Sequence, residues 1–251
     1  MLARRIIPQL LVDGKKLIKG RRFDGWRSVG VVMPAVKVHQ QRQVDEIMIL
    51  DIAATPEKRG PDLDMISNLA SETFSPLTVG GGIRTVDDVR DLLRHGADKV
   101  CVGTAAMRDK RFVCAAANKF GISTLVGAID YKIHHGVPLV YIRCGTHPLL
   151  VRPEQAAMQM EECGIGEILL TCIDREGTME GYDIETILEV TESVSIPVIA
   201  AGGCAGYGDM FNAILCGADA VSAGALFQFT DSTPQCAAQW LKDAGVEVRC
   251  A

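Results

Sequence analysis

The chain has 251 residues, of which 48% are hydrophobic and 23% are charged, a composition that excludes a disordered protein. The formal net charge of −5 argues against nucleic acid as a partner, and no apolar run approaches the ~18–20 residues of a membrane span. The nine cysteines include no C-x-x-C pair, and the N-terminus has no long apolar segment of the signal-peptide kind. We therefore expect a cytoplasmic protein with reduced thiols.

Short motifs recur along the chain at a constant separation of 121 residues. Gly96-Ala97-Asp98 returns as Gly217-Ala218-Asp219, and Gly103 returns as Gly224. The other matched segments are Glu46–Leu50 with Glu167–Thr171, Asp62–Ile66 with Asp183–Ile187, and Pro76–Gly82 with Pro197–Gly203. A constant offset over several motifs indicates two fused halves, approximately residues 1–122 and 123–251.

Each half alternates short aliphatic runs with helix-like stretches. Continuous apolar runs are typical of parallel strands that are buried on both faces. The expected strands are Arg5–Leu11, Glu46–Asp51, Ser75–Val79, Lys99–Val102, Thr124–Asp130, Glu167–Cys172, Ile196–Ala200 and Ala220–Ser222. Helical spacing is found in Asp62–Ser71, Thr85–His95, Asp183–Thr191 and Ser232–Ala244. The pattern predicts a single α/β domain over residues 1–251, a (β/α)₈ TIM barrel built from two half-barrels, with an open doubly wound sheet as the alternative.

Glycine-rich loops follow several of the expected strands, at the end of the barrel where active sites form. Such loops lead into helices and direct backbone N–H groups toward an anion, typically phosphate. Because the loops occur in pairs related by the repeat, they predict two phosphate sites on opposite sides of the barrel mouth and a long substrate with a phosphate at each end. Glycines required only by tight turns are the alternative. The candidate phosphate-binding residues are Gly81, Gly82, Gly103, Thr104, Gly177, Thr178, Gly202, Gly203, Gly224 and Ala225.

Two carboxylates end strands and are candidates for proton transfer. Asp130 follows the apolar run of the fifth strand and should point into the mouth, and Asp51 ends the second strand in the same way. Lys19 could reach a phosphate or a carboxylate. The residue of the first strand that corresponds to Asp130 is Leu11, which cannot move a proton, and Asp13 fits an Asp-Gly hairpin turn.

Four charged residues stand at the opposite, N-terminal ends of the strands. Arg5, Glu46, Lys99 and Glu167 open the first, second, fourth and sixth strands. Two cations and two carboxylates there can form a closed ring of ion pairs. Stability is the ordinary role of this face of a barrel, and a functional role requires a reason to gate the barrel axis.

Taken together, these motifs resemble the cyclase subunit of imidazole-glycerol-phosphate synthase, an enzyme of histidine biosynthesis. The similarity runs from Met1 to Arg249, and its most specific segments are Leu77–Arg84, Gly96–Val100, Gly166–Leu170, Ile173–Thr178 and Gly181–Asp183. The isomerase of the same pathway shares the half-repeat and is a more distant match.

The resemblance implies a partner and a reaction. In this family, a separate glutaminase subunit docks on the N-terminal face, forming a heterodimer, and its ammonia passes along the barrel axis. The ring residues Arg5, Glu46, Lys99 and Glu167 match the family's gate, and Asp98 matches an interface residue. At the mouth, ammonia reacts with a bis-phosphorylated ribonucleotide (PRFAR) to give imidazole glycerol phosphate and AICAR. The resemblance implies no cofactor and no metal.

The chain departs from the family pattern at the mouth. The family uses two aspartates as acid and base; Asp130 matches the second, while Leu11 stands at the place of the first. Gly103 replaces a usual Asn, Glu176 a usual Asp and Ala201 a usual Ser, and Val31-Val32 an Asp-Pro. Glu176 adds a methylene beside a predicted phosphate site. From Leu11 we expect weak cyclisation, since losing a positioned acid–base group typically removes ~10²–10⁴-fold of rate.

These departures keep two further hypotheses open. Paralogues of the family deliver ammonia for acetamidino-sugar formation in surface-polysaccharide synthesis, and the segments Leu10–Val12 and Ala53–Pro61 look like them. A non-catalytic barrel that only activates a glutaminase is the third hypothesis. The retained Lys19, Asp51, Asp130 and loop glycines favour the histidine enzyme.

Overall fold

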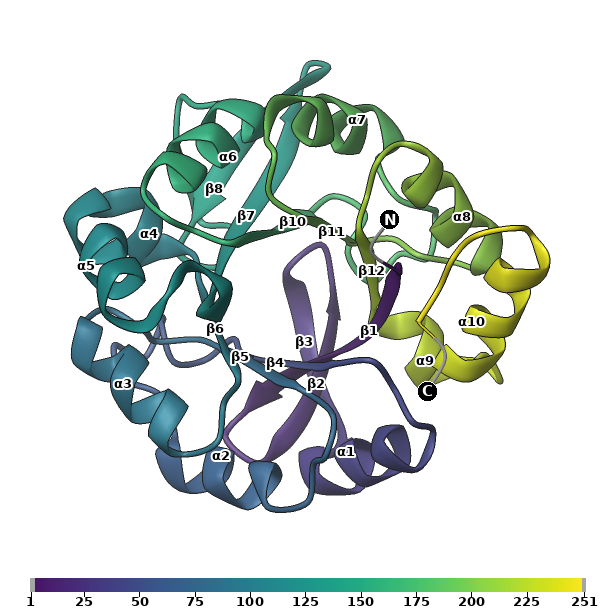
Figure 1. Cartoon of the computed structure of the whole chain (residues 1–251), viewed down its shortest axis with the longest axis horizontal. Helices are drawn as coiled ribbons and strands as arrows, with labels where there is room; N and C mark the ends of the chain where they lie inside the picture. Colours follow the sequence, from purple (N-terminus) through teal and green to yellow (C-terminus); the bar gives the residue numbers. More distant parts are fainter. Residues whose placement is uncertain (1–2, 250–251) are drawn as a thin grey trace.

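Eight parallel strands close into a barrel in the computed structural model, which describes residues 3–249 (Figure 1). Met1, Leu2, Cys250 and Ala251, which belong to the predicted domain 1–251, lie outside the described residues. The strands follow one another around the barrel in chain order, and pairing of β7 with β10 completes the circle. The barrel strands are β1 (Arg5–Asp13), β4 (Ile47–Asp51), β5 (Leu77–Gly80), β6 (Lys99–Val102), β7 (Leu125–His134), β10 (Glu167–Cys172), β11 (Val198–Ala201) and β12 (Ala220–Ala223). The predicted barrel is confirmed, and the open sheet is excluded.

Helices form an outer layer around the strands (Figure 1). The four predicted helices correspond to α2, α3, α7 and α10, and the N-terminus of α3 is fixed by a capping box in which Thr85 and Asp88 bond each other's backbone N–H groups. Within residues 3–249, no helix is both long and apolar enough to cross a membrane. The helices are α1 (Val32–Gln41), α2 (Leu63–Ala70), α3 (Val86–Arg94), α4 (Thr104–Arg108), α5 (Lys110–Phe120), the 3₁₀ helix η1 (Ile122–Thr124), α6 (Pro153–Glu162), α7 (Ile184–Ser193), α8 (Tyr207–Leu215), α9 (Ala225–Phe229) and α10 (Pro234–Asp243).

Side chains alternate along each barrel strand between the helix layer and the barrel interior. On β4, Ile47 and Ile49 pack into the large core under the helices, whereas Met48 belongs to a separate cluster inside the barrel. That inner cluster is apolar and consists of Ile7, Met48, Cys101, Val126, Leu169, Ile199, Ala201 and Ala220, with Leu50 and Ala128 packed against it. The barrel axis is thus lined by small and aliphatic side chains between its two ends.

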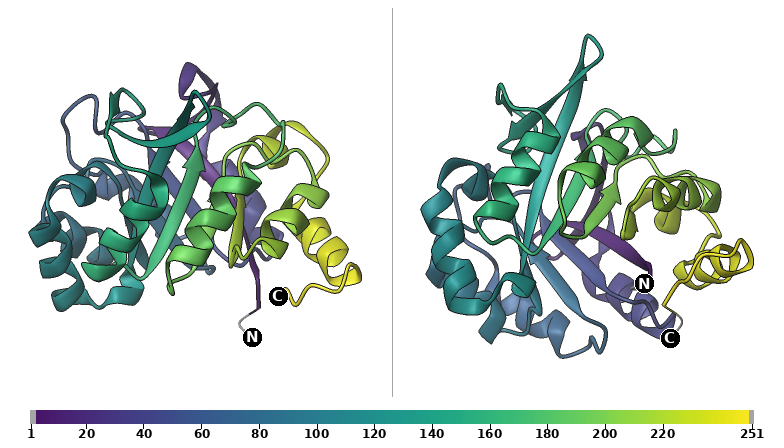
Figure 2. Two further views of the ribbon diagram at one scale, coloured as in Figure 1. Left: turned by 90° about the horizontal axis from the view of Figure 1, so that it is seen from above. Right: turned by 45° about the horizontal axis from the view of Figure 1, so that its top comes forward.

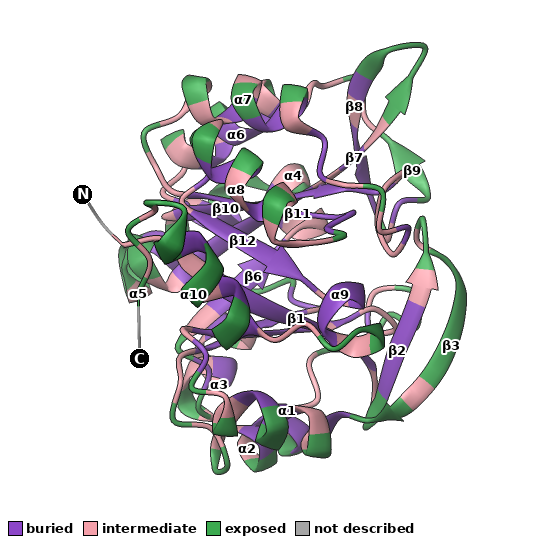
Figure 3. Ribbon diagram, turned by 90° about the vertical axis from the view of Figure 1, so that its right-hand side faces the viewer, coloured by how far each residue is buried: buried purple, intermediate pink, exposed green. Residues whose placement is uncertain are grey.

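Two antiparallel extensions rise from the C-terminal end of the barrel, opposite the chain termini (Figure 2). The first is formed by β2 (Lys16–Arg21) and β3 (Asp24–Val31), and it begins at the Asp13-Gly14 turn that the sequence predicts, with Gly14 at φ 52°. The second, β8 (Val137–Ile142) and β9 (His147–Pro148), was not expected. Figure 3 shows that β2 is largely buried while β3 is an exposed edge strand. Both extensions stand over the predicted mouth.

Candidate functional site

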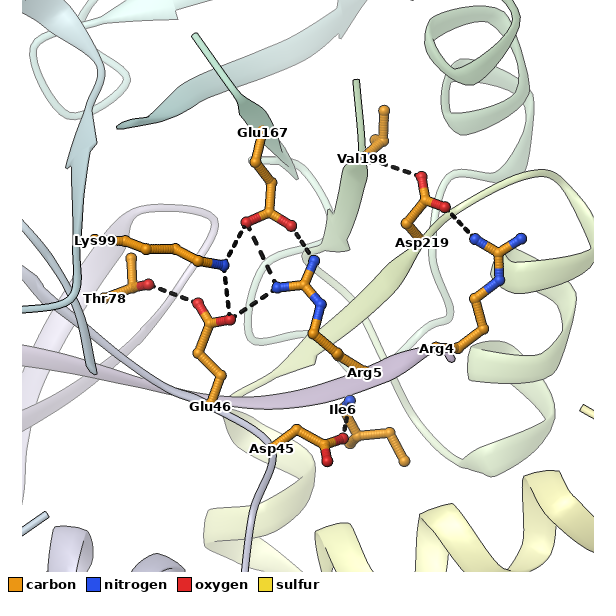
Figure 4. Close-up of polar contacts among 10 residues, drawn as sticks. All are labelled: Arg4, Arg5, Ile6, Asp45, Glu46, Thr78, Lys99, Glu167, Val198 and Asp219. Carbon is orange, nitrogen blue, oxygen red and sulfur yellow. Dashed lines mark hydrogen bonds and ion pairs between the residues drawn. The ribbon is translucent and has the colours of Figure 1, made fainter. Parts of the chain in front are cut away.

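The four charged residues predicted at the N-terminal end of the barrel meet in one closed ring of ion pairs (Figure 4). Glu46 accepts hydrogen bonds from Arg5 Nη1 at 2.8 Å and from Lys99 Nζ at 3.0 Å. Glu167 accepts from Lys99 Nζ at 2.8 Å and from Arg5 Nη2. The Thr78 hydroxyl donates to the second oxygen of Glu46 at 2.6 Å. Each carboxylate therefore bridges both cations.

Burial makes this ring, defined as Arg5, Glu46, Lys99 and Glu167, a tightly coupled unit. Glu46 is 2% exposed and Glu167 6% exposed. Burial alone would lower the pKa of Arg5, but the hydrogen bonds and charges of Glu167 and Glu46 outweigh it, so the pKa lies above its usual value. The two positive and two negative charges cancel, and removal of any member would leave an uncompensated buried charge. The ring closes the barrel axis at this end.

The residues around the ring follow the 121-residue repeat only in part. Asp98 accepts a hydrogen bond from the Leu77 N–H at 2.8 Å, and Asp219 accepts one from the Val198 N–H at 3.2 Å. These matching contacts hold the start of one strand to the start of the next in each half. Asp219 also pairs with Arg4, so the two sites are not identical.

The cations of the ring come from the first half alone. The residues 121 positions after Arg5 and Lys99 are Val126 and Ala220. Both are buried beside the ring, because Val126 pairs with Glu167 and Ala220 pairs with Arg5 in the strand register. The second half consequently contributes one charged residue to the ring, Glu167, and has apolar residues at the two positions that correspond to the cations.

At the other end of the axis, Asp130 occupies an inward-facing position on β7. Its neighbours in the strand, Ile129 and Tyr131, belong to the outer core, and its partner in the register is the buried Thr171 of β10. Burial and, to a smaller extent, the negative charge of Glu176 raise the pKa of Asp130 to about 7, although the Thr171 hydroxyl opposes the shift. A carboxyl group with this pKa can donate or accept a proton near neutral pH.

Asp51 has a different environment, although the sequence gives it the same position at a strand end. It shares the outward register of Ile49, and its carboxylate receives both Nη groups of Arg59, at 2.7 and 2.9 Å. The backbone N–H groups of Ala53 and Ala54 donate to the same carboxylate at 3.0 and 3.1 Å. These four contacts fix the loop that follows β4.

Leu11 lies across the mouth from Asp130 and points inward beside Leu50, its partner in the register. It is buried and carries no group that could exchange a proton. β1 is therefore apolar at the one position where the family resemblance leads us to expect an acid.

Lys19 reaches into the mouth from β2. It is only 4% exposed, and its Nζ donates to the Gln9 carbonyl at 3.4 Å. A Cβ on Gly224 would lie 2.5 Å from that Nζ, so the glycine leaves the space that the ammonium group fills. Burial lowers the pKa of Lys19, and the charge of Glu176 opposes the shift.

A pocket of about 260 Å³ opens between the loops of the second half. Half of the predicted phosphate-binding residues line it, together with Glu176 and two buried polar residues that sequence reasoning missed, Gln9 and Ser222. Ser222 Oγ donates to Gln9 Oε1 at 3.1 Å. Thr178 lies beside the pocket and its hydroxyl donates to the Arg175 carbonyl at 2.8 Å. The predicted residues that line the pocket are Gly177, Gly202, Gly203, Gly224 and Ala225.

The corresponding loops of the first half are packed more tightly. Gly81 and Gly82 have φ of 114° and 72°, and a Cβ on either would lie within 2.7 Å of the carbonyl oxygens of Asp51 or Arg59. Gly103 precedes α4, and the Thr104 hydroxyl accepts a hydrogen bond from the Arg143 N–H at 2.9 Å. Among the first-half candidates, Gly81 lines a cavity of about 210 Å³ against α2, which it shares with Asp51.

The missed residues carried a weak signal in the sequence. Gln9, Thr78 and Ser222 are polar residues within short apolar strands. A polar residue at an inward position of a buried strand needs a hydrogen-bond partner, which here is another residue of the interior. The register that identifies those partners joins strands that are far apart in the chain.

Known proteins match the chain over nearly its whole length. A family model described as histidine biosynthesis protein matches residues 5–233. The subunit HisF of imidazole glycerol phosphate synthase from Pyrobaculum aerophilum is 43% identical over 250 residues, covering 99% of each chain. The HisF subunits from Chlorobium phaeobacteroides and Chlorobaculum tepidum are 40% and 39% identical, covering 99% of this chain and all of theirs. The chain belongs to the histidine biosynthesis protein family.

Proposed function

We propose that the chain is the cyclase subunit of an imidazole glycerol phosphate synthase. It uses ammonia to convert PRFAR into imidazole glycerol phosphate and AICAR. The observation that carries this proposal is the similarity to HisF subunits, which extends over 99% of the chain at about 40% identity. These relatives favour the histidine reaction over acetamidino-sugar formation and over a non-catalytic barrel.

The barrel axis supports the delivery of ammonia from one end to the other. Ammonia is neutral and can enter an apolar passage, whereas ammonium would lose its hydration there at a large energetic cost. We propose that ammonia passes through the apolar inner cluster around Met48, Val126 and Leu169, at whose N-terminal end the ring stands. A glutaminase docked over the ring, in contact with Asp98, would release ammonia where water is excluded.

The mouth supports recognition of a phosphorylated substrate. Lys19 places a positive charge against Gly224, at the edge of the pocket that Gly177, Gly202 and Gly203 also line. A phosphate there would receive backbone N–H groups and the ammonium group together. The first-half loops at Gly82, Gly103 and Thr104 are the proposed site for the second phosphate.

The test is turnover of PRFAR by the purified chain. Saturating ammonium at alkaline pH supplies ammonia directly, so that no glutaminase is needed. We expect imidazole glycerol phosphate and AICAR to form in equal amounts, and glutamine to replace ammonium once a HisH-type glutaminase is added. Absence of both products under both conditions would refute the proposed function.

A further inference from the structure

The proposed reaction needs proton transfer at the mouth, and Leu11 removes one of the two carboxylates that the family resemblance leads us to expect. Ammonia that adds to an electrophilic carbon leaves a positive charge on nitrogen, so a base must take a proton. The oxygen that departs as water must receive one from an acid. Asp130 alone would have to act in both steps.

A second carboxylate enters the mouth from the loop after β10. Glu176 lines the 260 Å³ pocket together with Gln9, Ser222 and Gly224. β10 pairs with β7 along its whole length, so the turn that carries Glu176 begins next to the end of the strand that carries Asp130.

The backbone of Glu176 is held from two sides, which fixes its position at the barrel end. Its N–H donates to the Cys172 and Ile173 carbonyls at 3.0 and 3.2 Å, and its carbonyl accepts from the Arg22 N–H at 2.8 Å. A Cβ on the next residue, Gly177, would lie 2.2 Å from the Gly20 carbonyl. The β2–β3 hairpin therefore presses the loop against the barrel end.

From this placement we propose that Glu176 is the second proton-transfer carboxylate and works with Asp130, in the role that Leu11 cannot fill. The inference rests on the proposed cyclase function. Glu176 is then a functional residue of the pocket and not merely a larger side chain beside a phosphate.

The charges at the mouth are consistent with a pair that holds one proton. The groups that interact with Glu176 are Asp130 on β7, Lys19 on β2 and Tyr182 before α7. Burial raises the pKa of Glu176, and the charge of Lys19 opposes the shift. The two carboxylates and the one cation are together neutral when the pair of carboxylates shares a single proton, as in other acid–base dyads.

One proton on the pair is sufficient for a complete cycle. The ionised carboxylate takes a proton from the nitrogen as the new C–N bond forms. The protonated carboxylate gives its proton to the oxygen, which becomes a hydroxyl group. The pair again holds one proton, so the exchange repeats: a second proton leaves the nitrogen as the C–O bond breaks, and the hydroxyl group receives the second proton and leaves as water. The pair ends with the one proton with which it started, so no further reactant is required.

The experiment compares Glu176→Gln with the parent chain in the ammonium-dependent assay. We expect kcat to fall ~10²-fold or more with little change in KM, and the pH profile to lose one of its two limbs. Glu176→Asp should keep much of the activity. Leu11→Asp should restore at least tenfold activity to Glu176→Gln, while in the parent chain it should change turnover less than about threefold. The matched control is Glu180→Gln, which changes an exposed acid that follows Glu176 in the same loop.

Each alternative outcome has a separate meaning. If the parent chain turns over PRFAR and Glu176→Gln stays within threefold of it, the inference is wrong while the proposed function stands. A change in KM alone would make Glu176 a binding residue and would also overturn the inference. If the parent chain makes no product with ammonium or with a glutaminase, the proposed function fails and the role of Glu176 fails with it. Circular dichroism of every variant confirms that the fold is intact.

Discussion

The two ends of the barrel axis both concentrate charged side chains, but they arrange them in opposite ways. At the ring, two cations and two carboxylates bridge one another, and every charge has two partners. At the mouth, the charge of Glu176 raises the pKa of Asp130, and Glu176 and Lys19 shift each other's pKa. Charges that satisfy one another make a firm closure, whereas charges left partly unsatisfied remain available to a substrate. The comparison predicts that mutations in the ring will mainly lower the stability of the protein, whereas mutations at the mouth will mainly lower its activity.

The largest effect is expected at Asp130. Asp130→Asn should reduce ammonium-dependent turnover by ~10²–10⁴-fold, because it removes a proton-transfer group. It should also stabilise the protein at alkaline pH. The pKa of Asp130 rises from 3.8 to about 7 on folding, so the folded state loses stability as the pH increases from about 4 through 7 and the carboxyl ionises in a buried site.

Thermal unfolding at pH 4 and pH 8 tests the stability part of this prediction. The variant and the parent chain should unfold at similar temperatures at pH 4, and the variant at a higher temperature at pH 8. A lower unfolding temperature for Asp130→Asn at pH 8 would contradict the raised pKa of Asp130, because it would show that the ionised carboxylate stabilises the fold.

The ring should respond in the opposite way. Glu46→Gln leaves Arg5 and Lys99 with one carboxylate between them, which should lower the free energy of unfolding by about 3–5 kcal/mol. Ammonium-dependent turnover should remain within a few-fold, since the mouth is unchanged, while glutamine-dependent turnover with a glutaminase should fall. Denaturant unfolding and the two assays measure these effects.

The control for the ring is Glu72→Gln, which removes an exposed ion pair with Lys37 and should change stability by less than about 1 kcal/mol. Equal losses of unfolding free energy in Glu46→Gln and Glu72→Gln would show that burial does not strengthen the ion pairs of the ring.

An intermediate effect is expected at Asp51, the predicted catalytic candidate that lies outside the pocket of the second half. Asp51→Asn weakens the contact with both Nη groups of Arg59 and should cost about 1–3 kcal/mol of stability. The pH profile of turnover should keep its shape, because the four contacts give Asp51 a structural role. Loss of one limb of the pH profile would instead identify Asp51 as a catalytic acid or base. Asp64→Asn, on an exposed helix position, is the control.

The smallest effect is expected from removing the cation of the mouth. Lys19 lowers the pKa of Glu176, so Lys19→Met should raise that pKa and shift the pH profile of turnover upward. KM for PRFAR should increase as well if the ammonium group binds a phosphate. Lys16→Met, an exposed lysine on the same strand, should leave the profile in place.

Sequence reasoning was most successful where a regular pattern determines geometry. Arg5, Glu46, Lys99 and Glu167 each open an expected strand, and parallel strands place such residues at the same end of the barrel, where the structure brings them together (Figure 4). The shared direction of the strands thus predicted the ring without knowledge of any contact.

The mouth was harder to predict because it is built from loops. Asp51 and Asp130 look alike as strand ends, but they differ in register, and only the fold shows that Arg59 lies close enough to bind Asp51. Glu176 was expected beside a phosphate site, and the structure places it on the wall of the pocket that the second-half glycines line. Nothing in the sequence indicated that its charge would act on the pKa of Asp130 and be opposed by Lys19. The expectation of weak cyclisation rests on Leu11 alone, and turnover by the parent chain distinguishes it from the role proposed for Glu176.

Both cations of the ring come from the first half of the chain, and this fact bears on how such a barrel could arise by duplication. Two copies of the first half would place four cations and two carboxylates around the axis, and two copies of the second half would place two carboxylates and no cation. Neither ancestor would be electrically neutral at this end. Core residues of the first half, such as Ile47, Ile66 and Leu77, have buried apolar counterparts 121 residues later, but the neutral ring requires that Arg5 differ from Val126 and Lys99 from Ala220. Divergence of the two halves at these positions is thus the step that permits a closed passage.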